Sequence, residues 1–484
     1  MNLVLRLLAA FAICTVCPVA RPEAPPPIAI THVTVIDATG APSQADQTII
    51  ISDARIKDVG PSATTKLPKG ARIIDARGKF VIPGLWDMHV HLAGVSADPS
   101  WSKRVFLPLL LANGITGVRD MGGDLEALLS WKRDVEAGSL LGPHIVASGP
   151  WLAGGGKKSP EQFPVADAEE ARAAVRDLKQ RGADFIKIIS LPSREAFFAV
   201  ADEAKKQGIT FVGHVPSVVT ASEASDAGMH SIEHIVYSEL AYDCSSREAE
   251  LRQAAREARA KRDGEALAKL SMQAIGTYSP EKAAALWARF KRNGTWEVPT
   301  LASIAVNAPA KVTPEQQAHD PQLEFVPETL RKQWDPRLPD NQQSAEDQKW
   351  WTRQFANDYK LAGEMHRAGV LILAGSDSLD RFVFPGQSLH KELALLVDDG
   401  FTPMEALQSA TRDAARFLNR ESDFGTVAVG KWADLVLLDA DPLKNIGNAD
   451  SISAVVRGGV YLDRAALDRL LAEAKAAAKA VPVK

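Results

Sequence analysis

Short apolar runs alternate with amphipathic stretches through the central part of the chain, between about residues 80 and 420. Runs of this length indicate strands buried on both faces, whereas the stretches between them repeat apolar positions at the helical period. The clearest helical stretches are Asp167–Gln180, Ser193–Gln207 and Lys349–Arg367. Such alternation of strand and helix is typical of a parallel α/β fold.

Eight of the apolar runs qualify as strands of one barrel. They are Phe80–Asp87, Thr116–Asp120, His144–Ser148, Asp184–Ile189, Thr210–His214, Ser231–His234, Thr295–Thr300 and Val370–Asp377. With helices between them, they predict a (β/α)₈ TIM barrel over residues 80–423. The segments 241–294 and 305–349 interrupt the spacing of the late strands, and we expect them to be insertions on loops at the active face.

The two ends of the chain share a different pattern. Residues 28–79 and 424–462 contain short β-type runs separated by Gly, Pro, Asp and Ser. Because the same pattern flanks the central region on both sides, we predict one small β-sandwich domain built from both chain ends. Residues 463–484 are rich in Ala and Lys, and we expect a partly exposed helical tail there.

Residues 1–20 have the layout of a secretory signal peptide. Arg6 precedes an apolar stretch from Leu7 to Val19, and small residues follow up to Ala20. The stretch is too short for a comfortable membrane span. We therefore expect a periplasmic or secreted protein, with no stable membrane span after signal cleavage. An uncleaved anchor and a lipid anchor on Cys17 are the alternatives.

Composition and charge narrow the classes of partner. Hydrophobic residues make up 46% and charged residues 24% of the chain, as in ordinary soluble proteins. The net charge of -4 gives no basic excess, so we expect no nucleic-acid partner. Of the three cysteines, Cys14 and Cys17 lie in the signal segment. Cys244 alone cannot form an intrachain disulfide or a thiolate-rich metal site.

The strongest chemical signal is a His-x-His pair at the end of the first central strand. His89 and His91 follow the apolar run that begins at Val81. Side chains two positions apart on a strand point to the same side, so both imidazoles face one place. Two neutral imidazoles at a strand's carboxyl end are suited to bind a divalent metal ion.

Four more polar side chains lie near the ends of predicted strands: Lys187, His214, His234 and Asp377. A lysine inside an apolar strand is costly to bury unless it is paired or modified. One interpretation of Lys187 is a side chain that reaches outward to solvent. The other is a lysine carbamylated by CO₂, whose two oxygens bridge two cations. A single histidine at a strand end is often structural, but four such groups beside a His-x-His pair favour a metal centre.

These residues, with the segments Thr402–Leu407 and Gly430–Leu438, resemble the amidohydrolase superfamily, in the branch that includes imidazolonepropionase-like proteins and metallo-dipeptidases. The resemblance covers nearly the whole mature chain. It implies a barrel with a flanking β-sandwich, two divalent metal ions and hydrolysis of a C–N amide bond. We expect the ions to be Zn²⁺ and the substrate to be a small-molecule amide, such as a dipeptide, an N-acyl amino acid or a cyclic amide.

The resemblance also implies a role for each polar residue. Six would hold the metal ions: His89 and His91 with Asp377 for the more buried ion, His214 and His234 for the second ion, and carbamylated Lys187 between the two. Two cations close together can lower the pKa of a water molecule between them and polarise a carbonyl group. A carboxylate hydrogen-bonded to that water, which we expect to be Asp377, can act as general base and then as general acid.

Several assignments remain open in the sequence. Tyr237 and Arg119 are candidates for substrate contact, although Arg119 could equally form a structural salt bridge. His144 begins its predicted strand, and we expect it to be structural. The alternative functions are a mononuclear, imidazolonepropionase-like hydrolase of a cyclic amide and a non-catalytic metal-binding barrel. The sequence leaves a homo-oligomer open.

Overall fold

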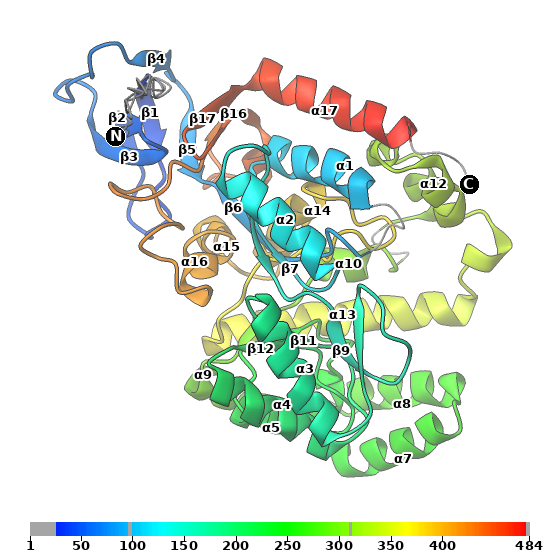
Figure 1. The fold of residues 1–484 in the computed structure, drawn as a ribbon. Coiled ribbons are helices and arrows are strands. Elements are labelled where there is room, and N and C mark those ends of the chain that lie inside the picture. Colours follow the sequence, from blue (N-terminus) through cyan, green and yellow to red (C-terminus); the bar gives the residue numbers. More distant parts are fainter. Residues whose placement is uncertain (1–25, 95–98, 309–311, 481–484) are drawn as a thin grey trace, which may run out of the picture.

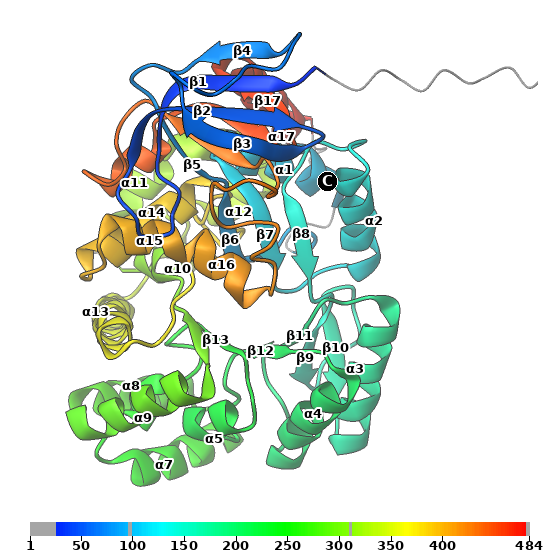
Figure 2. The same ribbon diagram turned by 90° about the vertical axis from the view of Figure 1, so that its left-hand side faces the viewer.

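The computed structural model describes residues 26–94, 99–308 and 312–480. The predicted signal peptide and two of the cysteines, Cys14 and Cys17, lie outside these residues. Within them, no helix combines the length and apolar character needed to cross a bilayer. The described chain has an α/β fold, in which the sheet from the chain ends lies at one end of the molecule (Figures 1 and 2).

The two chain ends form one mixed sheet of eight strands. Its members are β1 (Ile28–Val35), β2 (Gln44–Ser52), β3 (Arg55–Pro61), β4 (Arg72–Asp75), β5 (Phe80–Pro83), β15 (Leu435–Leu438), β16 (Ile452–Arg457) and β17 (Val460–Asp463). The strand order is β17-β16-β15-β5-β1-β2-β3, and β4 also pairs with β1. The predicted sandwich of two facing sheets is not found among these strands, because β5 pairs with both β1 and β15 and joins the two ends into one sheet.

Alternating apolar side chains give this sheet its own core. Ile28 and Ile30 from β1 share a cluster with Leu435 and Leu437 from β15. In each strand the two residues are two positions apart and therefore point to the same face. The apolar faces of strands from both chain ends therefore pack together in one core.

The central strands are parallel and form two sheets. One contains β6 (Leu85–Val90), β7 (Ile115–Asp120) and β8 (His144–Ala147). The other has the order β10-β9-β11-β12-β13-β14. Its strands are β9 (Trp151–Gly154), β10 (Gln162–Val165), β11 (Ile186–Ile188), β12 (Phe211–Gly213), β13 (Ser231–Glu233) and β14 (Trp296–Val298). The predicted alternation of strand and helix is present, but the strands are assigned to two sheets and not to one closed barrel.

Seven of the eight predicted central strands correspond to strands of the structure, and the last does not. The segment predicted as Val370–Asp377 makes only isolated parallel bridges near its ends, from Ile372 to Glu297 and from Ser378 to Val90. Asp377 has a φ of 62°, which is incompatible with a continuing strand. The segment therefore lies between β14 and β6 without forming a regular ladder.

Two short strands, β9 and β10, were not predicted. They lie in the glycine-rich segment after β8, and β9 pairs with β11 at the edge of the six-stranded sheet. Strands of only four residues show too little apolar alternation to be recognised from the sequence. Their pairing brings the loop between them over the ends of the central strands.

Helices surround the central strands. They are α1 (Pro99–Ala112), α2 (Leu125–Glu136), α3 (Ala168–Arg181), α4 (Arg194–Gln207), α5 (Ala221–Asp226), α6 (Leu240–Asp243), α7 (Glu248–Ala260), α8 (Gly264–Gly276), α9 (Pro280–Asn293), α10 (Leu301–Ala305), α11 (Pro314–Ala318), α12 (Glu328–Trp334), α13 (Ala345–Ala368), α14 (Gln387–Asp398), α15 (Pro403–Ser409), α16 (Arg412–Phe417) and α17 (Arg464–Lys479). Three short 3₁₀ helices are η1 (Pro321–Phe325), η2 (Pro339–Asn341) and η3 (Ile446–Asp450).

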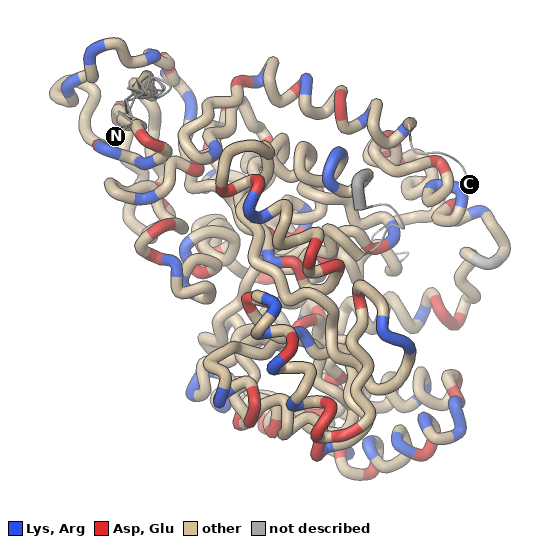
Figure 3. The backbone as a smooth tube through the Cα atoms, in the orientation of Figure 1, with Lys and Arg blue, Asp and Glu red and all other residues tan. Residues whose placement is uncertain are grey.

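The predicted insertions are helical in the structure. Segment 241–294 contains α7, α8 and α9, which form the end of the molecule away from the terminal sheet in both views (Figures 1 and 2). Segment 305–349 holds only short helices before α13 begins. The predicted tail is α17, which packs along α1. Acidic and basic residues are interspersed along the tube in Figure 3, in keeping with the small net charge.

Candidate metal centre

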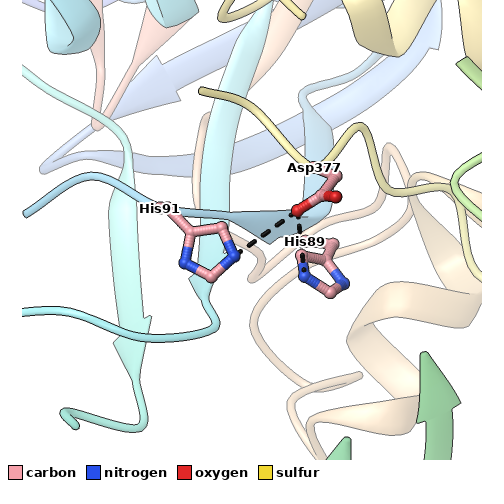
Figure 4. Close-up of side chains that lie close together, drawn as sticks. All are labelled: His89, His91 and Asp377. Atoms are coloured by element: carbon pink, nitrogen blue, oxygen red, sulfur yellow. Dashed lines mark ion pairs between the residues drawn. The ribbon is translucent and has the colours of Figure 1, made fainter. Parts of the chain in front are cut away.

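His89 and His91 lie at the carboxyl end of β6 and point toward Asp377 (Figure 4). The Nε2 atom of His89 is 3.3 Å from Asp377 Oδ1, and that of His91 is 3.4 Å from the same oxygen. Possible ligand atoms of the three residues all lie within 4.8 Å of one another. The two imidazoles therefore face one place, as the His-x-His pattern predicted. The carboxylate comes from a segment almost three hundred residues further along the chain.

Each imidazole of this pair is fixed through its other nitrogen. His89 Nδ1 is 2.8 Å from Glu233 Oε2, and His91 Nδ1 is 3.1 Å from the carbonyl oxygen of Gly122. Both partners accept hydrogen bonds, so each Nδ1 carries the proton and each Nε2 presents a lone pair. This is the arrangement in which histidines usually bind metal ions.

The donor set fits a metal ion. His89 Nε2 is buried and has no hydrogen-bond partner among the described residues. A buried acceptor without a partner is costly, and a bound cation would satisfy it. Two imidazole nitrogens and one carboxylate oxygen form a ligand set that Zn²⁺ and several other divalent ions accept.

The other three predicted ligands lie in the same pocket. His234 follows β13, and its Nε2 is 3.8 Å from Asp377 Oδ2. Its Nδ1 is 2.6 Å from Thr300 Oγ1, which orients the ring. The His214 ring lies 5.1 Å from that of His234. Lys187, on β11, is 1% exposed, so it does not reach outward to solvent as one interpretation of the sequence allowed.

All six predicted metal-binding residues line one open pocket of about 510 Å³. The complete lining is His89, His91, Gly94, Trp151, Glu161, Lys187, Ile189, His214, His234, Tyr237, Asp377, Leu379 and Asp380. The ends of parallel strands meet at one side of a sheet, and for this reason residues far apart in the sequence gather here.

Burial, with nearby positive charge, holds His89, His214 and His234 neutral. Burial, and then the charge of Lys187, set the pKa values of His89 and His214 well below the usual range. Burial alone would lower the pKa of His91, but the hydrogen bond and charge of Asp377 raise it. Burial favours the neutral form of Asp377, yet its electrostatic interactions with His234, His89 and His91 keep its pKa below normal. The centre therefore offers three neutral imidazoles and an ionised carboxylate near neutral pH.

Arg119 lies beneath the centre, away from the pocket lining. Its Nη2 is 2.8 Å from Glu233 Oε1, and its Nε donates to the carbonyl oxygen of Met88 at 2.6 Å. The predicted substrate contact is not possible for this fully buried guanidinium, because its donors are directed to groups inside the protein. Its role is the structural ion pair, and through Glu233 it supports His89.

Tyr237, the other predicted substrate contact, does line the pocket. Its ring stacks on that of His214 at 5.7 Å, and the side chain is 44% exposed. It therefore stands at the mouth of the pocket, in reach of a bound molecule. His144 lies at the start of β8 and is not part of the lining.

Several residues of the centre were not predicted from the sequence. Glu233 and Thr300 orient metal-binding histidines, and three further pocket residues were not singled out: Trp151, Glu161 and Asp380. The position of Glu233 beside His234 was a usable signal, because a buried carboxylate next to a metal ligand commonly supports another ligand. Trp151 and Glu161 belong to the loop of β9 and β10 and carry no signal of their own.

The chain has several similarities to known proteins. Residues 80–462 match the model of the amidohydrolase family. Ochratoxinase of Aspergillus niger is 23% identical over 460 residues, covering 82% of this chain and 78% of that enzyme. Among solved structures, a Xaa-Pro dipeptidase with bound methionine in its active site has a TM-score of 0.66 at 22% identity, over 90% of this chain and 100% of the other. Bottromycin amidohydrolase has a TM-score of 0.67 at 23% identity, over 94% and 91% of the two chains.

Proposed function

Because the chain belongs to the amidohydrolase family and is a hydrolase of that type, we propose that it cleaves C–N amide bonds of small molecules with the help of metal ions. One observation carries the proposal: six side chains from five separate segments of the chain, all of types that bind or bridge metals, line a single pocket. Their neutral imidazoles and ionised carboxylate suit divalent cations. We also propose that the protein acts outside the cytoplasm, from the signal-like pattern of residues 1–20.

We propose a centre for two Zn²⁺ ions. His89 and His91 with Asp377 would hold the first, and His214 and His234 would hold the second. When bound, such ions lower the pKa of a water molecule and polarise a carbonyl group. The orphaned Nε2 of His89 and the grouping of its three donor atoms support the first position.

Lys187 would bridge the two ions as a carbamate. CO₂ reacts with the neutral amine, and burial lowers the pKa of Lys187 to about 8, so a neutral fraction is accessible near physiological pH. No carboxylate among the described residues lies within ion-pair distance of its Nζ. A buried cation without an ion pair is costly, and conversion to a carbamate between two cations removes that cost.

Asp377 would move the proton. Its carboxylate lies between the Nε2 atoms of His89, His91 and His234, at the floor of the pocket. Because its low pKa keeps it ionised, it can accept a proton from an attacking water and later deliver it to the leaving nitrogen. A metal ion shared with His89 and His91 would hold the carboxylate in place for both transfers.

Amides of small molecules are the substrates to test first. The structural neighbours include a dipeptidase and an amidohydrolase, and both match over at least 90% of this chain. The tight grouping of only three ligand atoms also supports a second candidate, a mononuclear hydrolase of a cyclic amide. The two candidates differ in the number of ions that each chain binds.

The test is elemental analysis of protein purified with bicarbonate, together with a panel of dipeptides, N-acyl amino acids and cyclic amides. We expect two divalent ions per chain, amide hydrolysis by the metal-loaded protein, and loss of turnover by about a thousandfold or more in Asp377→Asn. One ion per chain would favour the mononuclear candidate. A metal-loaded protein that hydrolyses no amide, or an Asp377→Asn variant with near-normal activity, would contradict the proposal.

Lys187→Ala separates the bridge from the rest of the centre. We expect this variant to bind fewer than two ions and to recover metal and activity partly when short-chain carboxylic acids are added, because their two oxygens can replace the carbamate. Lys132→Ala is the matched control, since Lys132 is a partly exposed lysine that pairs with Asp184 outside the pocket. A Lys187→Ala variant with unchanged metal content would exclude the bridging role.

A further inference from the structure

The outer part of the candidate active-site pocket is acidic. Beyond the residues proposed to bind metal, its lining contains two carboxylates, Glu161 and Asp380. Among the described residues, no arginine lines the pocket, and Lys187, at its buried floor, is the only lysine that does. If Lys187 carries a carbamate, no cationic side chain remains among the lining residues to hold an anionic substrate group.

Glu161 is placed next to Trp151 by the loop between β9 and β10. The backbone N–H of Trp151 donates to the carbonyl oxygen of Glu161 at 2.8 Å. The Trp151 ring lies edge-on to that of His91, with 6.0 Å between the ring centroids. The loop approaches the strand ends closely, since a Cβ added at Gly94 would lie 3.5 Å from Glu161 Cγ. Among the described residues, no hydrogen bond or ion pair engages the Glu161 carboxylate, which is only partly exposed.

Asp380 lines the same pocket as Tyr237, and its charge acts on the Tyr237 hydroxyl group. One of its oxygens accepts the Arg381 N–H at 2.7 Å. The neighbouring Arg381 guanidinium donates to Asn341 Oδ1 at 2.9 Å and does not line the pocket. The Tyr237 ring, stacked on His214, provides an aromatic face at the same place.

On the basis of the proposed function, we propose that the preferred substrate is an amide carrying a primary ammonium group, which Glu161 with Trp151, and Asp380 with Tyr237, recognise. A carboxylate beside an aromatic face is a favourable site for an ammonium ion, because charge pairing and cation–π attraction act together. An amide with a free carboxylate would instead meet two like charges and no lysine or arginine, which disfavours it.

The test compares amides of one length and three charges. N-acetylputrescine, N-pentylacetamide and N-acetyl-γ-aminobutyrate carry a cation, a neutral group and an anion on the amine side. The N-methylamides of δ-aminovaleric, hexanoic and glutaric acids carry a cation, a neutral group and an anion on the acyl side. We expect kcat/KM for the cationic amide to exceed that for the anionic amide by about tenfold or more on at least one side, from two partly exposed charge contacts.

Two variants assign the preference to residues. We expect Glu161→Gln and Asp380→Asn each to lower the ratio of kcat/KM for the cationic and neutral amides, by about three- to fivefold. Glu421→Gln, which removes an exposed carboxylate that does not line the pocket, should leave that ratio unchanged. Equal rates for the three charges, a preference for the carboxylate, or ratios that neither variant alters would overturn the inference.

Failure of the proposed function has a separate signature. If the metal-loaded protein hydrolyses none of the six amides, their equilibrium binding can be measured directly by calorimetry. The same order of affinities, lowered for the cationic amide by Glu161→Gln, would support ammonium recognition in a protein that is not an amide hydrolase. Affinities independent of charge would overturn the inference in that case as well.

Discussion

Two buried glutamates on neighbouring strands have opposite chemical environments. Glu233, at the end of β13, accepts hydrogen bonds from Arg119 and lies 2.8 Å from His89 Nδ1. Glu297, on β14, is bridged to Ile232 of β13, and neither of its oxygens has a partner among the described residues. Burial raises the pKa of Glu297 well above its usual value and favours its protonated form, whereas Glu233 accepts hydrogen bonds from the Arg119 guanidinium.

This contrast predicts different responses to the same substitution. Glu233→Gln leaves the buried Arg119 charge without its partner and weakens the support of His89. We expect a loss of about 3 kcal/mol in the free energy of unfolding and a ten- to hundredfold weaker metal affinity. Chemical denaturation and competition with a chelator measure the two effects.

Glu297→Gln is the matched control. An amide replaces a protonated carboxyl group of nearly the same shape, so we expect less than about 1 kcal/mol of change in stability and an unaltered metal affinity. Equal effects of the two substitutions would show that the charge of Glu233 does not support the centre.

At the scale of elements, the pairing of β11 with β12 positions two of the proposed metal ligands. Lys187 lies in β11, and His214 follows β12. His214 N–H donates to the carbonyl oxygen of Ile188 at 2.9 Å, and Ile188 is paired with Gly213. Gly213 has a φ of 133°, and a Cβ there would lie 2.0 Å from the Ile188 carbonyl oxygen. The two strands can approach this closely only because the residue before His214 is glycine.

Gly213→Ala should therefore disturb the site and the fold together. We expect a loss of about 2–4 kcal/mol in the free energy of unfolding, from backbone strain and overlap, and a lower metal content per folded chain. Thermal melting and elemental analysis of the soluble variant provide the measurements.

Gly208→Ala separates strain from overlap. Gly208 ends α4 with a φ of 59°, but nothing lies within 4 Å of a Cβ there. We expect this variant to lose about 1 kcal/mol and to keep its metal content. If Gly213→Ala behaved in the same way, the close approach of β11 and β12 would not govern the position of His214.

At the scale of the whole molecule, a buried polar cluster joins the terminal sheet to the central strands. His144 Nε2, at the start of β8, is 2.9 Å from Asp434 Oδ2, just before β15. Asp434 also accepts the Gly458 N–H at 2.7 Å, and Arg457 Nε donates to the carbonyl oxygen of Gly142 at 2.9 Å. Trp86 stacks on His144, so the imidazole is held between aromatic and charged neighbours.

This junction predicts a dependence of stability on pH. Burial lowers the pKa of His144 below its usual value, although Asp434 opposes this shift. In the unfolded chain the imidazole has a pKa of about 6.5, so as the pH falls it takes up a proton at a higher pH than in the folded protein. The contribution of neutral His144 to stability is therefore fully present above about pH 6.5 and is lost as the pH falls through the lower, folded-state pKa.

Denaturation of the metal-free protein at pH 7 and pH 5 measures this dependence. We expect wild type to lose more stability over this interval than His144→Asn, which has no imidazole to protonate. His319→Asn, at an exposed position, should behave as wild type does. An equal loss in wild type and His144→Asn would contradict a neutral histidine at the junction.

The sequence predicted central strands and ligands where the local pattern was strong. His89 and His91 follow a long apolar run, and period two fixed their common direction. β9 and β10 were missed because a strand of four residues shows too little apolar alternation to be recognised. Val370–Asp377 was predicted as a strand from its apolar residues, which do not reveal that Asp377 has a left-handed backbone conformation. Arg119 was left open between substrate contact and a structural salt bridge, because its position near a strand end does not show whether its guanidinium points into the pocket or beneath it.

The sequence by itself determined the α/β character of the chain, most central strands and the six polar side chains of the candidate centre. Each follows from residues that are neighbours along the chain, where strand and helix periods fix which side chains share a face. The tertiary structure decided that both chain ends share one sheet, that Glu233 links Arg119 to His89, and that Glu161 and Asp380 reach the pocket mouth. These relations join residues far apart in sequence, and only packing of the whole chain determines their distances and charges.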